Sequence, residues 1–229
     1  MGRRTLLIDA DPQGNATTGL GMSAAAGSIS TYEVIEGSKP LQKAHRCTSI
    51  PGLDLVPSTV DLMGAEIELV DSERREYRLL DAVQAAPTDH DYILIDCPPA
   101  LGFLTLNALT ASQTVLIPLQ CEFFALQGLT QLVRTLQRVR RVFNPSLGIE
   151  GVVLTMYDKR NKLSAQVAED VRNCMGSKVY ETIIPRNVRM SEAPSHGKPA
   201  LIYDRHCAGS TAYMALAREV LRRETLAAA

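Results

Sequence analysis

Two apolar runs in this chain end in aspartates, and carboxylates at such places can hold a metal-bound phosphate. The first run leads into Asp9 and Asp11, which a Pro-Gln-Gly turn follows, and the run at 92–95 leads into Asp96. Open α/β sheets bind ligands at the carboxyl ends of their strands, so we expect the three acids to meet at one sheet edge. Two such strand ends indicate a magnesium–nucleotide site.

Each acid also has an ordinary structural interpretation. Acids beside proline and glycine suit turns, so the segment Asp-Pro-Gln-Gly at 11–14 can be a turn and nothing more. Asp96 can be a helix N-cap or part of a surface turn. Against this, Asp96 closes a run of four apolar residues, where an unpaired charge is costly and a magnesium ion would relieve the cost. On the functional interpretation Asp9 faces the phosphate and metal, and Asp11 enters the turn and orients water.

The loop that would complete a phosphate site is not found in the sequence. No segment of residues 1–229 reads GxxxxGK[ST], and neither Gly19-Leu20-Gly21 nor Gly197-Lys198-Pro199 qualifies. The backbone amide cradle and the phosphate-binding lysine of such a loop are therefore not among these residues.

Composition limits the class of protein. The chain has 229 residues, 45% hydrophobic and 21% charged, as expected for a soluble globular protein with one α/β domain over 1–229. Its formal charge of −1 excludes a globally basic nucleic-acid binder but leaves room for a local basic patch. The five cysteines have no CxxC spacing, and there is no signal peptide or apolar run near ~18 residues. We therefore expect reduced thiols, a cytoplasmic protein and no attachment to a membrane.

The apolar periodicity predicts strands that alternate with helices. This alternation favours a mostly parallel, twisted sheet with helices on both faces, a three-layer α/β fold. Strands are expected at 5–9, 53–57, 92–96, 114–118, 151–156 and 178–184. Helices are expected at 61–69, 74–86, 104–111, 125–143, 164–175 and 211–223, and a loop at 13–26.

Five long segments closely resemble the ParA/Soj chromosome- and plasmid-partitioning ATPases, a class of P-loop NTPases. The resemblance covers about residues 4–224, and several of the segments are long enough to be highly specific. They read LLIDADPQGNATTGLG, YILIDCPPALGFLTLNALTAS, VLIPLQCEFFALQGL, EGVVLTMYDKRN and IPRNVRMSEAPSHGKPALIYD.

The resemblance implies roles for particular residues. Asp11 would help to position the attacking water, and Asp96 would be the Walker B residue that holds Mg²⁺ beside ATP. The same site would include Asp9, Gln13 and Gly14, with Pro185 and Asn187 near the adenine. Non-specific DNA binding would use Arg160 and Arg189.

The resemblance also implies partners and a location. These are a homodimer formed on ATP binding, non-specific nucleoid DNA and a ParB-like centromere-binding protein. Family members begin with a strand, a KGGVGKTT-type loop and a helix, and the chain as written starts after them. We therefore expect a truncated form of a longer ATPase. The alternatives are a non-hydrolysing remnant that binds DNA or a partner, and a MinD-like regulator.

Overall fold

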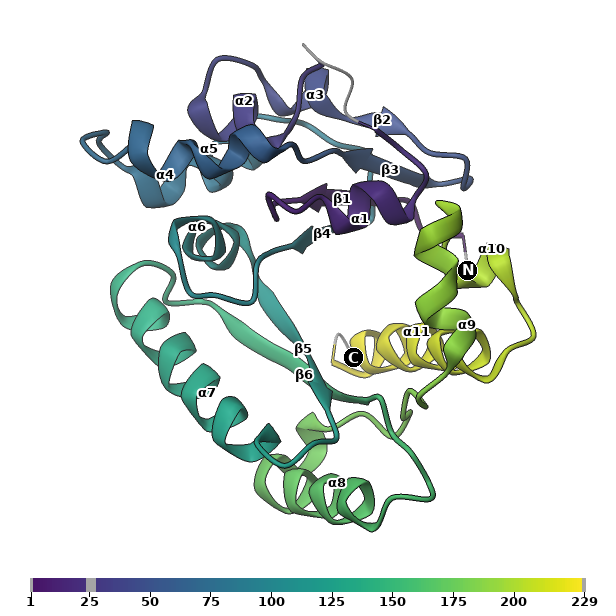
Figure 1. Ribbon diagram of the computed structural model, residues 1–229. Coiled ribbons are helices and arrows are strands. Elements are labelled where there is room, and N and C mark those ends of the chain that lie inside the picture. The colour runs from purple at the N-terminus through teal and green to yellow at the C-terminus, as the bar shows by residue number, and fades with distance from the viewer. Residues whose placement is uncertain (1, 24–27, 228–229) are drawn as a thin grey trace. The chain divides into compact units, whose positions relative to one another are not determined.

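The chain folds into two compact units in a computed structural model that describes residues 2–23 and 28–227. The first unit comprises Met1–Gln113 with Arg141–Pro145, and the second comprises Thr114–Arg140 with Ser146–Ala229. Both are drawn in Figure 1. The single domain expected over residues 1–229 stays a prediction.

The first unit contains a four-stranded sheet in the order β2-β3-β1-β4. Strand β1 (Thr5–Asp9) lies between β3 (Leu53–Val56) and β4 (Tyr92–Asp96) and is parallel to both. The short β2 (Arg46–Cys47) adds an antiparallel edge to β3. The expected strands at 5–9 and 92–96 are therefore confirmed to the residue.

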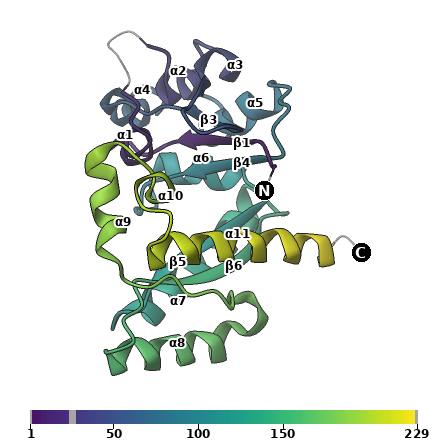
Figure 2. The same ribbon diagram turned by 90° about the vertical axis from the view of Figure 1, so that its right-hand side faces the viewer.

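Helices of the first unit bury one face of this sheet. Leu6 and Ile8 of β1 pack in one apolar cluster with Val34, Leu41 and Leu79, which come from three helices. Figure 2 shows those helices, α2, α3 and α5, together on one side of β1 and β3. The helical elements are α1 (Asn15–Gly19), α2 (Thr31–Glu36), α3 (Leu41–Ala44), η1 (Val60–Met63), α4 (Ala65–Glu68), η2 (Arg75–Tyr77), α5 (Arg78–Gln84) and α6 (Phe103–Ala111).

The second unit is built on two parallel strands, β5 (Thr114–Gln120) and β6 (Gly148–Thr155). Figure 1 shows α7 along one side of this pair and α11 along the other. Val153 of β6 packs with Tyr180, Ile184 and Leu216, so α11 is attached to the strand pair through an apolar core. The helical elements are α7 (Ala125–Val142), α8 (Lys162–Met175), η3 (Gly176–Lys178), α9 (Val188–Glu192), η4 (Ala193–His196), α10 (Ala200–Tyr203) and α11 (Ala208–Ala227).

The structure confirms the α/β class with mainly parallel strands, and the helix expected at 125–143 is α7. Leu129, Leu136 and Val139 of its expected inner stripe are buried. Among the described residues, none of the helices combines the length and apolar composition that a bilayer crossing requires.

The strand expected at 178–184 is wrong. Only isolated bridges form there, Val152 to Val179 and Tyr157 to Pro185. The reason is the buried carboxylate of Glu219, which accepts hydrogen bonds from the backbone N–H groups of Glu181 (2.8 Å) and Thr182 (2.9 Å). Those amides are then not available for a ladder with β6.

Two further expectations need correction. The loop expected at 13–26 contains helix α1, and residues 24–26 lie outside the described part of the chain. The single helix expected at 61–69 is instead a 3₁₀ turn, η1, followed by the short helix α4. Gly64 joins the two, because its N–H donates to the Asp61 carbonyl while its own carbonyl accepts from Glu68.

Candidate functional site at the carboxyl ends of β1 and β4

The carboxyl ends of β1 and β4 lie side by side and bring the predicted acids together. Asp9 and Asp96 are direct partners in the parallel register. The N–H of Ala10 donates to the Asp96 carbonyl at 2.7 Å, which fixes the point where both loops leave the sheet. The predicted convergence of Asp9, Asp11 and Asp96 on one edge is therefore confirmed, while their chemical roles stay predictions.

Asp9 is fully buried and its carboxylate is occupied by hydrogen bonds from the chain. One oxygen accepts from the backbone N–H of Thr17 at 2.8 Å and from its hydroxyl at 2.6 Å. The other accepts from the N–H of Asp11 at 3.2 Å. The Thr17 hydroxyl also accepts from the N–H of Ser58 at 3.0 Å. Asp9 thus ties β1 to helix α1 and to the end of β3, in keeping with the rule that buried charges are hydrogen-bonded.

Asp11 sits in the turn that follows and is half-buried. One carboxylate oxygen accepts from the N–H of Gln13 at 3.0 Å, and the Asp11 carbonyl accepts from Gly14 at 2.9 Å. Gly14 has φ +62°, a left-handed conformation in which a side chain would be strained. Within the described residues no donor reaches the second oxygen of Asp11, so that oxygen is available for water.

Asp96 differs from Asp9 because its side chain stays accessible to solvent. Partial loss of water, followed by the negative charges of Asp9 and Asp11, raises the pKa of Asp96. A cation placed beside this carboxylate would relieve both costs. Asp96 is therefore the member of the trio whose surroundings best fit a metal.

The donor set fits magnesium held mainly by water and phosphate. Among the described residues, no three His, Cys, Asp or Glu side chains are arranged to hold a metal ion by themselves. Mg²⁺ does not need such a cage, because it commonly uses one or two carboxylates together with waters and substrate phosphates.

Cys97, next to Asp96, has no features of a nucleophile. Burial, then the charges of Asp96 and Asp11, raises the pKa of its thiol to about 11. The reactive form of cysteine is the thiolate, which is therefore scarce at neutral pH. Cys97 is therefore best described as an unreactive, partly buried thiol.

The second unit holds the remaining predicted site residues on the loop after β6 and on the segment that leads into helix α9 and forms its first turn. The N–H of Tyr157 donates to the Ile184 carbonyl at 3.2 Å, and the N–H of Arg186 donates back to Tyr157 at 2.9 Å. Pro185 lies between these two bonds. Asn187 caps helix α9, because its side-chain oxygen accepts from the N–H of Arg189 at 3.0 Å.

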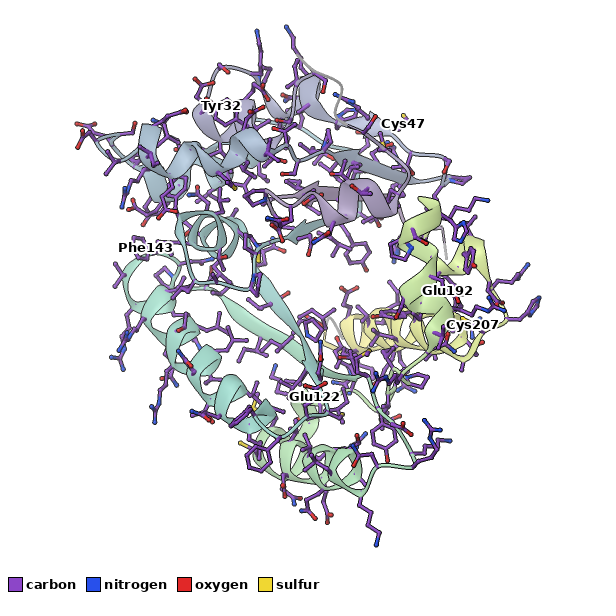
Figure 3. The ribbon with its side chains drawn as sticks, viewed as in Figure 1. Tyr32, Cys47, Glu122, Phe143, Glu192 and Cys207 are labelled. Carbon is purple, nitrogen blue, oxygen red and sulfur yellow. The ribbon has the colours of Figure 1, made fainter. Side chains whose placement is uncertain are left out.

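Both arginines predicted to bind DNA are already paired with acids. Arg160 forms a two-pronged pair with Asp158, with N–O distances of 3.0 and 2.8 Å, although its side chain is 89% exposed. Hydrogen bonds from the Arg160 side chain and backbone lower the pKa of Asp158 to about 2. Arg189 pairs at 2.9 Å with Glu192, which is labelled in Figure 3.

The structure also identifies residues that the sequence patterns did not. Thr17 donates to Asp9 and is in turn held by Ser58, and Asp158 and Glu192 pair with the two arginines. Thr17 and Ser58 carry no spacing signal, because their partners are eight and 41 residues away. Asp158 lies only two residues from Arg160, so that pairing could have been foreseen.

Comparison with known proteins places the chain among close relatives. Residues 1–149 match the family model described as an AAA domain. The chromosome partitioning protein ParA of Caulobacter vibrioides (strain NA1000 / CB15N) is 59% identical over 225 residues, 97% of this chain and 84% of that protein. The sporulation initiation inhibitor protein Soj of Bacillus subtilis (strain 168) is 50% identical over 220 residues, 96% of this chain and 87% of that protein.

Solved structures share the fold. A cobyrinic acid a,c-diamide synthase from Mycobacterium smegmatis, with bound ATP analog and magnesium, is 38% identical at a TM-score of 0.84, covering 96% of this chain and 83% of that one. MinD from Pyrococcus horikoshii OT3, complexed with Mg-ADP, is 23% identical at a TM-score of 0.76, covering 96% and 84%. At that identity the likeness shows the fold alone.

Proposed function

The chain belongs to the ParA/Soj family of chromosome-partitioning ATPases, and on that basis we propose that its β1–β4 edge serves a Mg²⁺–ATP site that drives a partitioning cycle. The observation that carries this proposal is the pairing of Asp9 with Asp96, with Asp11 in the adjoining turn. Support also comes from the solved relative that contains an ATP analog and magnesium at 38% identity.

We infer different roles for the three acids, because their surroundings differ. Asp96, accessible and with a raised pKa, would hold the metal directly or through a water. Bound Mg²⁺ would supply neutralisation of the phosphate charge. Asp11, with one oxygen available in the turn, would orient the attacking water. Asp9 was expected to face the phosphate and metal, but both of its oxygens accept hydrogen bonds from Thr17 and Asp11, so it would instead keep Asp11 and helix α1 in place.

Other residues would surround the nucleotide and the DNA. Gln13 and Gly14 continue the turn beside the phosphates, and Pro185 and Asn187 would contact the adenine. Arg160 and Arg189 would bind phosphates of non-specific DNA, and this binding would place the protein on the nucleoid in the cytoplasm. ATP binding would form the homodimer, and a ParB-like partner would stimulate hydrolysis.

Both arginines are already paired with an acid, so their carboxylate partners would compete with DNA phosphates for the same guanidinium groups. The test uses the extended chain, defined as residues 1–229 joined at the N-terminus to the family's strand, phosphate loop and helix. We expect Arg189→Glu to weaken ATP-dependent DNA binding by about tenfold or more in a filter assay, because attraction becomes repulsion. Asp158→Asn should strengthen binding by freeing Arg160.

The matched control is Arg138→Glu, a change at an exposed arginine on α7. It should leave DNA binding near the wild-type value, and nucleotide binding should persist in all three variants. Equal DNA retention by wild type and Arg189→Glu would exclude the DNA-binding role assigned to Arg189 on α9.

A further inference from the structure

A cavity of about 340 Å³ lies in the first unit, between the end of α2, the connection at residues 37–40, helix α3 and helix α5. Figure 2 shows these three helices together on one side of β1 and β3. The side chain of Gln42 on α3 donates to the carbonyl of Ala85, at the end of α5, at 3.2 Å, so the walls are joined across the cavity. Sites for small organic molecules commonly have volumes of about 300–1,000 Å³. The cavity is large enough for a small member of that class.

The inner wall of the cavity is apolar. Val34 of α2 and Leu41 of α3 line it, and each is only 2% exposed. Both belong to the apolar cluster that holds Leu6 and Ile8 of β1, and Ala82 of α5 lines the cavity and packs against the same cluster. This wall can receive the apolar part of a ligand and remove it from water.

Arg78 brings a positive charge to the cavity and has no partner among the described residues. Its Nε is buried and lacks a hydrogen-bond acceptor. One of its terminal nitrogens lies 3.5 Å from the position that a Cβ on Gly37 would take, so the side chain reaches from α5 to the end of α2. A guanidinium has five N–H donors, and a buried donor without an acceptor is costly. Arg78 therefore offers unused donors to an acceptor that enters the cavity.

The end of helix α2 does not account for these donors. A cation is favoured near the carboxyl end of a helix, where backbone carbonyls lack partners. Here the Glu33 carbonyl already accepts from the N–H groups of Gly37 at 3.1 Å and Lys39 at 3.2 Å. Within the described part of the chain, the guanidinium of Arg78 donates to none of the α2 carbonyls.

The remaining charges leave the cavity net positive. Asp81 lines it, one turn after Arg78 on α5, but the Asp81 carboxylate is paired with Arg74 at 2.7 Å. Lys39 also lines the cavity and is exposed, and its ammonium group pairs with no acid in the described residues. Two unpaired cations thus stand beside one neutralised acid and an apolar wall.

We propose that this cavity binds a small organic oxyanion, a carboxylate or phosphate group on a short apolar body. The head group would accept hydrogen bonds from Arg78 and Lys39, because a guanidinium matches both kinds of oxyanion in two-pronged geometry. The apolar body would cover Val34 and Leu41.

The proposed anion site is separate from the carboxylate site. Asp9, Asp11 and Asp96 do not line the cavity. The two sites are connected only through the apolar cluster behind β1, which contains Leu6 and Ile8. An effect of the anion on the nucleotide cycle would rest on the proposed function, whereas binding of the anion does not.

The test is fluorine NMR of small probes added to residues 1–229 without nucleotide or magnesium, at constant ionic strength. Para-fluorobenzoate and para-fluorophenyl phosphate share an apolar body and differ in head group, and para-fluorobenzamide is a neutral control shaped like the benzoate. At least one anion should show a fluorine line that broadens on addition of protein, with a Kd at least about tenfold lower than that of the amide. The anion with the lower Kd identifies the preferred head group.

Charge variants test the two cations. Arg78→Gln should raise the Kd of the preferred anion by about tenfold or more, because charge-assisted hydrogen bonds are lost. Lys39→Gln, at an exposed position, should raise it in the same direction and carries the test if Arg78→Gln fails to fold. The matched controls Arg138→Gln on α7 and Lys43→Gln on α3 change exposed cations that do not line the cavity and should leave the Kd unchanged.

A filling variant tests the cavity itself. Ala85→Leu adds a larger side chain to the lining while both cations remain, and it should raise the Kd by about tenfold or more. Its control is Gln84→Leu, which places the same side chain at an exposed neighbouring position outside the lining and should have no effect. Thermal melts of each variant verify that the fold is retained.

Three results would overturn the proposal. Neither anion binds, the neutral amide binds as tightly as both anions, or folded Arg78→Gln and Ala85→Leu bind the anion with the wild-type Kd. The last result would place the anion elsewhere on the surface. Because the assay contains no nucleotide, a chain that binds the anion but fails to hydrolyse ATP would contradict only the proposed function.

Discussion

Asp96 and Asp9 show how two aspartates at paired positions acquire different properties. Asp9 is closed off by Thr17 and the backbone of Asp11, whereas Asp96 faces solvent beside the other two charges. The sequence was sufficient to predict both residues, because each ends an apolar run. It was not sufficient to separate their roles, because Thr17 bonds to Asp9, and Ser58 to Thr17, only once α1 and β3 have folded against β1.

We expect Asp96→Asn to raise the thermal unfolding temperature at pH 7 in the absence of metal. The folded-state pKa of Asp96 is raised, so its charged form destabilises the fold, and asparagine removes that charge. The increase in unfolding temperature should be fully present at pH values above the folded-state pKa of Asp96. It should disappear as the pH falls to the pKa of an aspartate in the unfolded chain. Thermal melts across this range, read by circular dichroism, give the comparison.

The control is Asp89→Asn. Asp89 pairs with Arg4 at 3.6 Å and belongs to no acidic trio, so its replacement should not stabilise the protein. A wild-type protein more stable than Asp96→Asn at pH 7 would show that Asp96 has a favourable partner.

At the scale of elements, Gly151 of β6 lies directly against Lys178 and Tyr180, at and just after the end of η3. A Cβ on Gly151 would come within 2.9 Å of the Lys178 carbonyl oxygen and would overlap the ring of Tyr180, which is fully buried. A backbone oxygen cannot move aside as the end of a flexible side chain can. Gly151 therefore sets how closely residues 178–180 approach β6.

Gly151→Ala should destabilise the protein by about 1–3 kcal/mol, the usual cost of overpacking a core. Gly128→Ala is the matched change on α7, where a Cβ meets nothing within 4 Å. It should be neutral or stabilising by up to about 1 kcal/mol, because alanine favours helix. Urea unfolding of both variants measures the difference, and equal midpoints would contradict the assigned contact.

The elements that the sequence predicted well are those with uninterrupted patterns. Strands β1 and β4 and helix α7 follow from local apolar runs and helical spacing. The strand expected at 178–184 was wrong because Glu219, which is distant in sequence, takes the backbone N–H groups of Glu181 and Thr182. Helix α1 was not predicted because its N-cap residue, Gly14, has no side chain that could cap the helix, so the sequence carries no signal for its start.

For the whole molecule, the sequence similarity to known proteins and the geometry of the carboxylate site indicate the same function. The family is shown by relatives that match 96–97% of the chain at 50–59% identity. The different surroundings of Asp9, Asp11 and Asp96 support the different roles proposed for them, which identity alone does not give. In the proposed DNA-binding role of the two arginines, phosphate would compete with the carboxylates of Asp158 and Glu192 for the same side chains.

The most direct measurement is steady-state ATP hydrolysis by the extended chain with Mg²⁺, comparing wild type with Asp11→Ala. We expect magnesium-dependent turnover in the wild type and a loss of about a hundredfold or more in Asp11→Ala, with ATP still bound, because the water is no longer oriented. Equal rates in the two proteins, or hydrolysis that does not respond to magnesium, would contradict the assignment of this carboxylate edge.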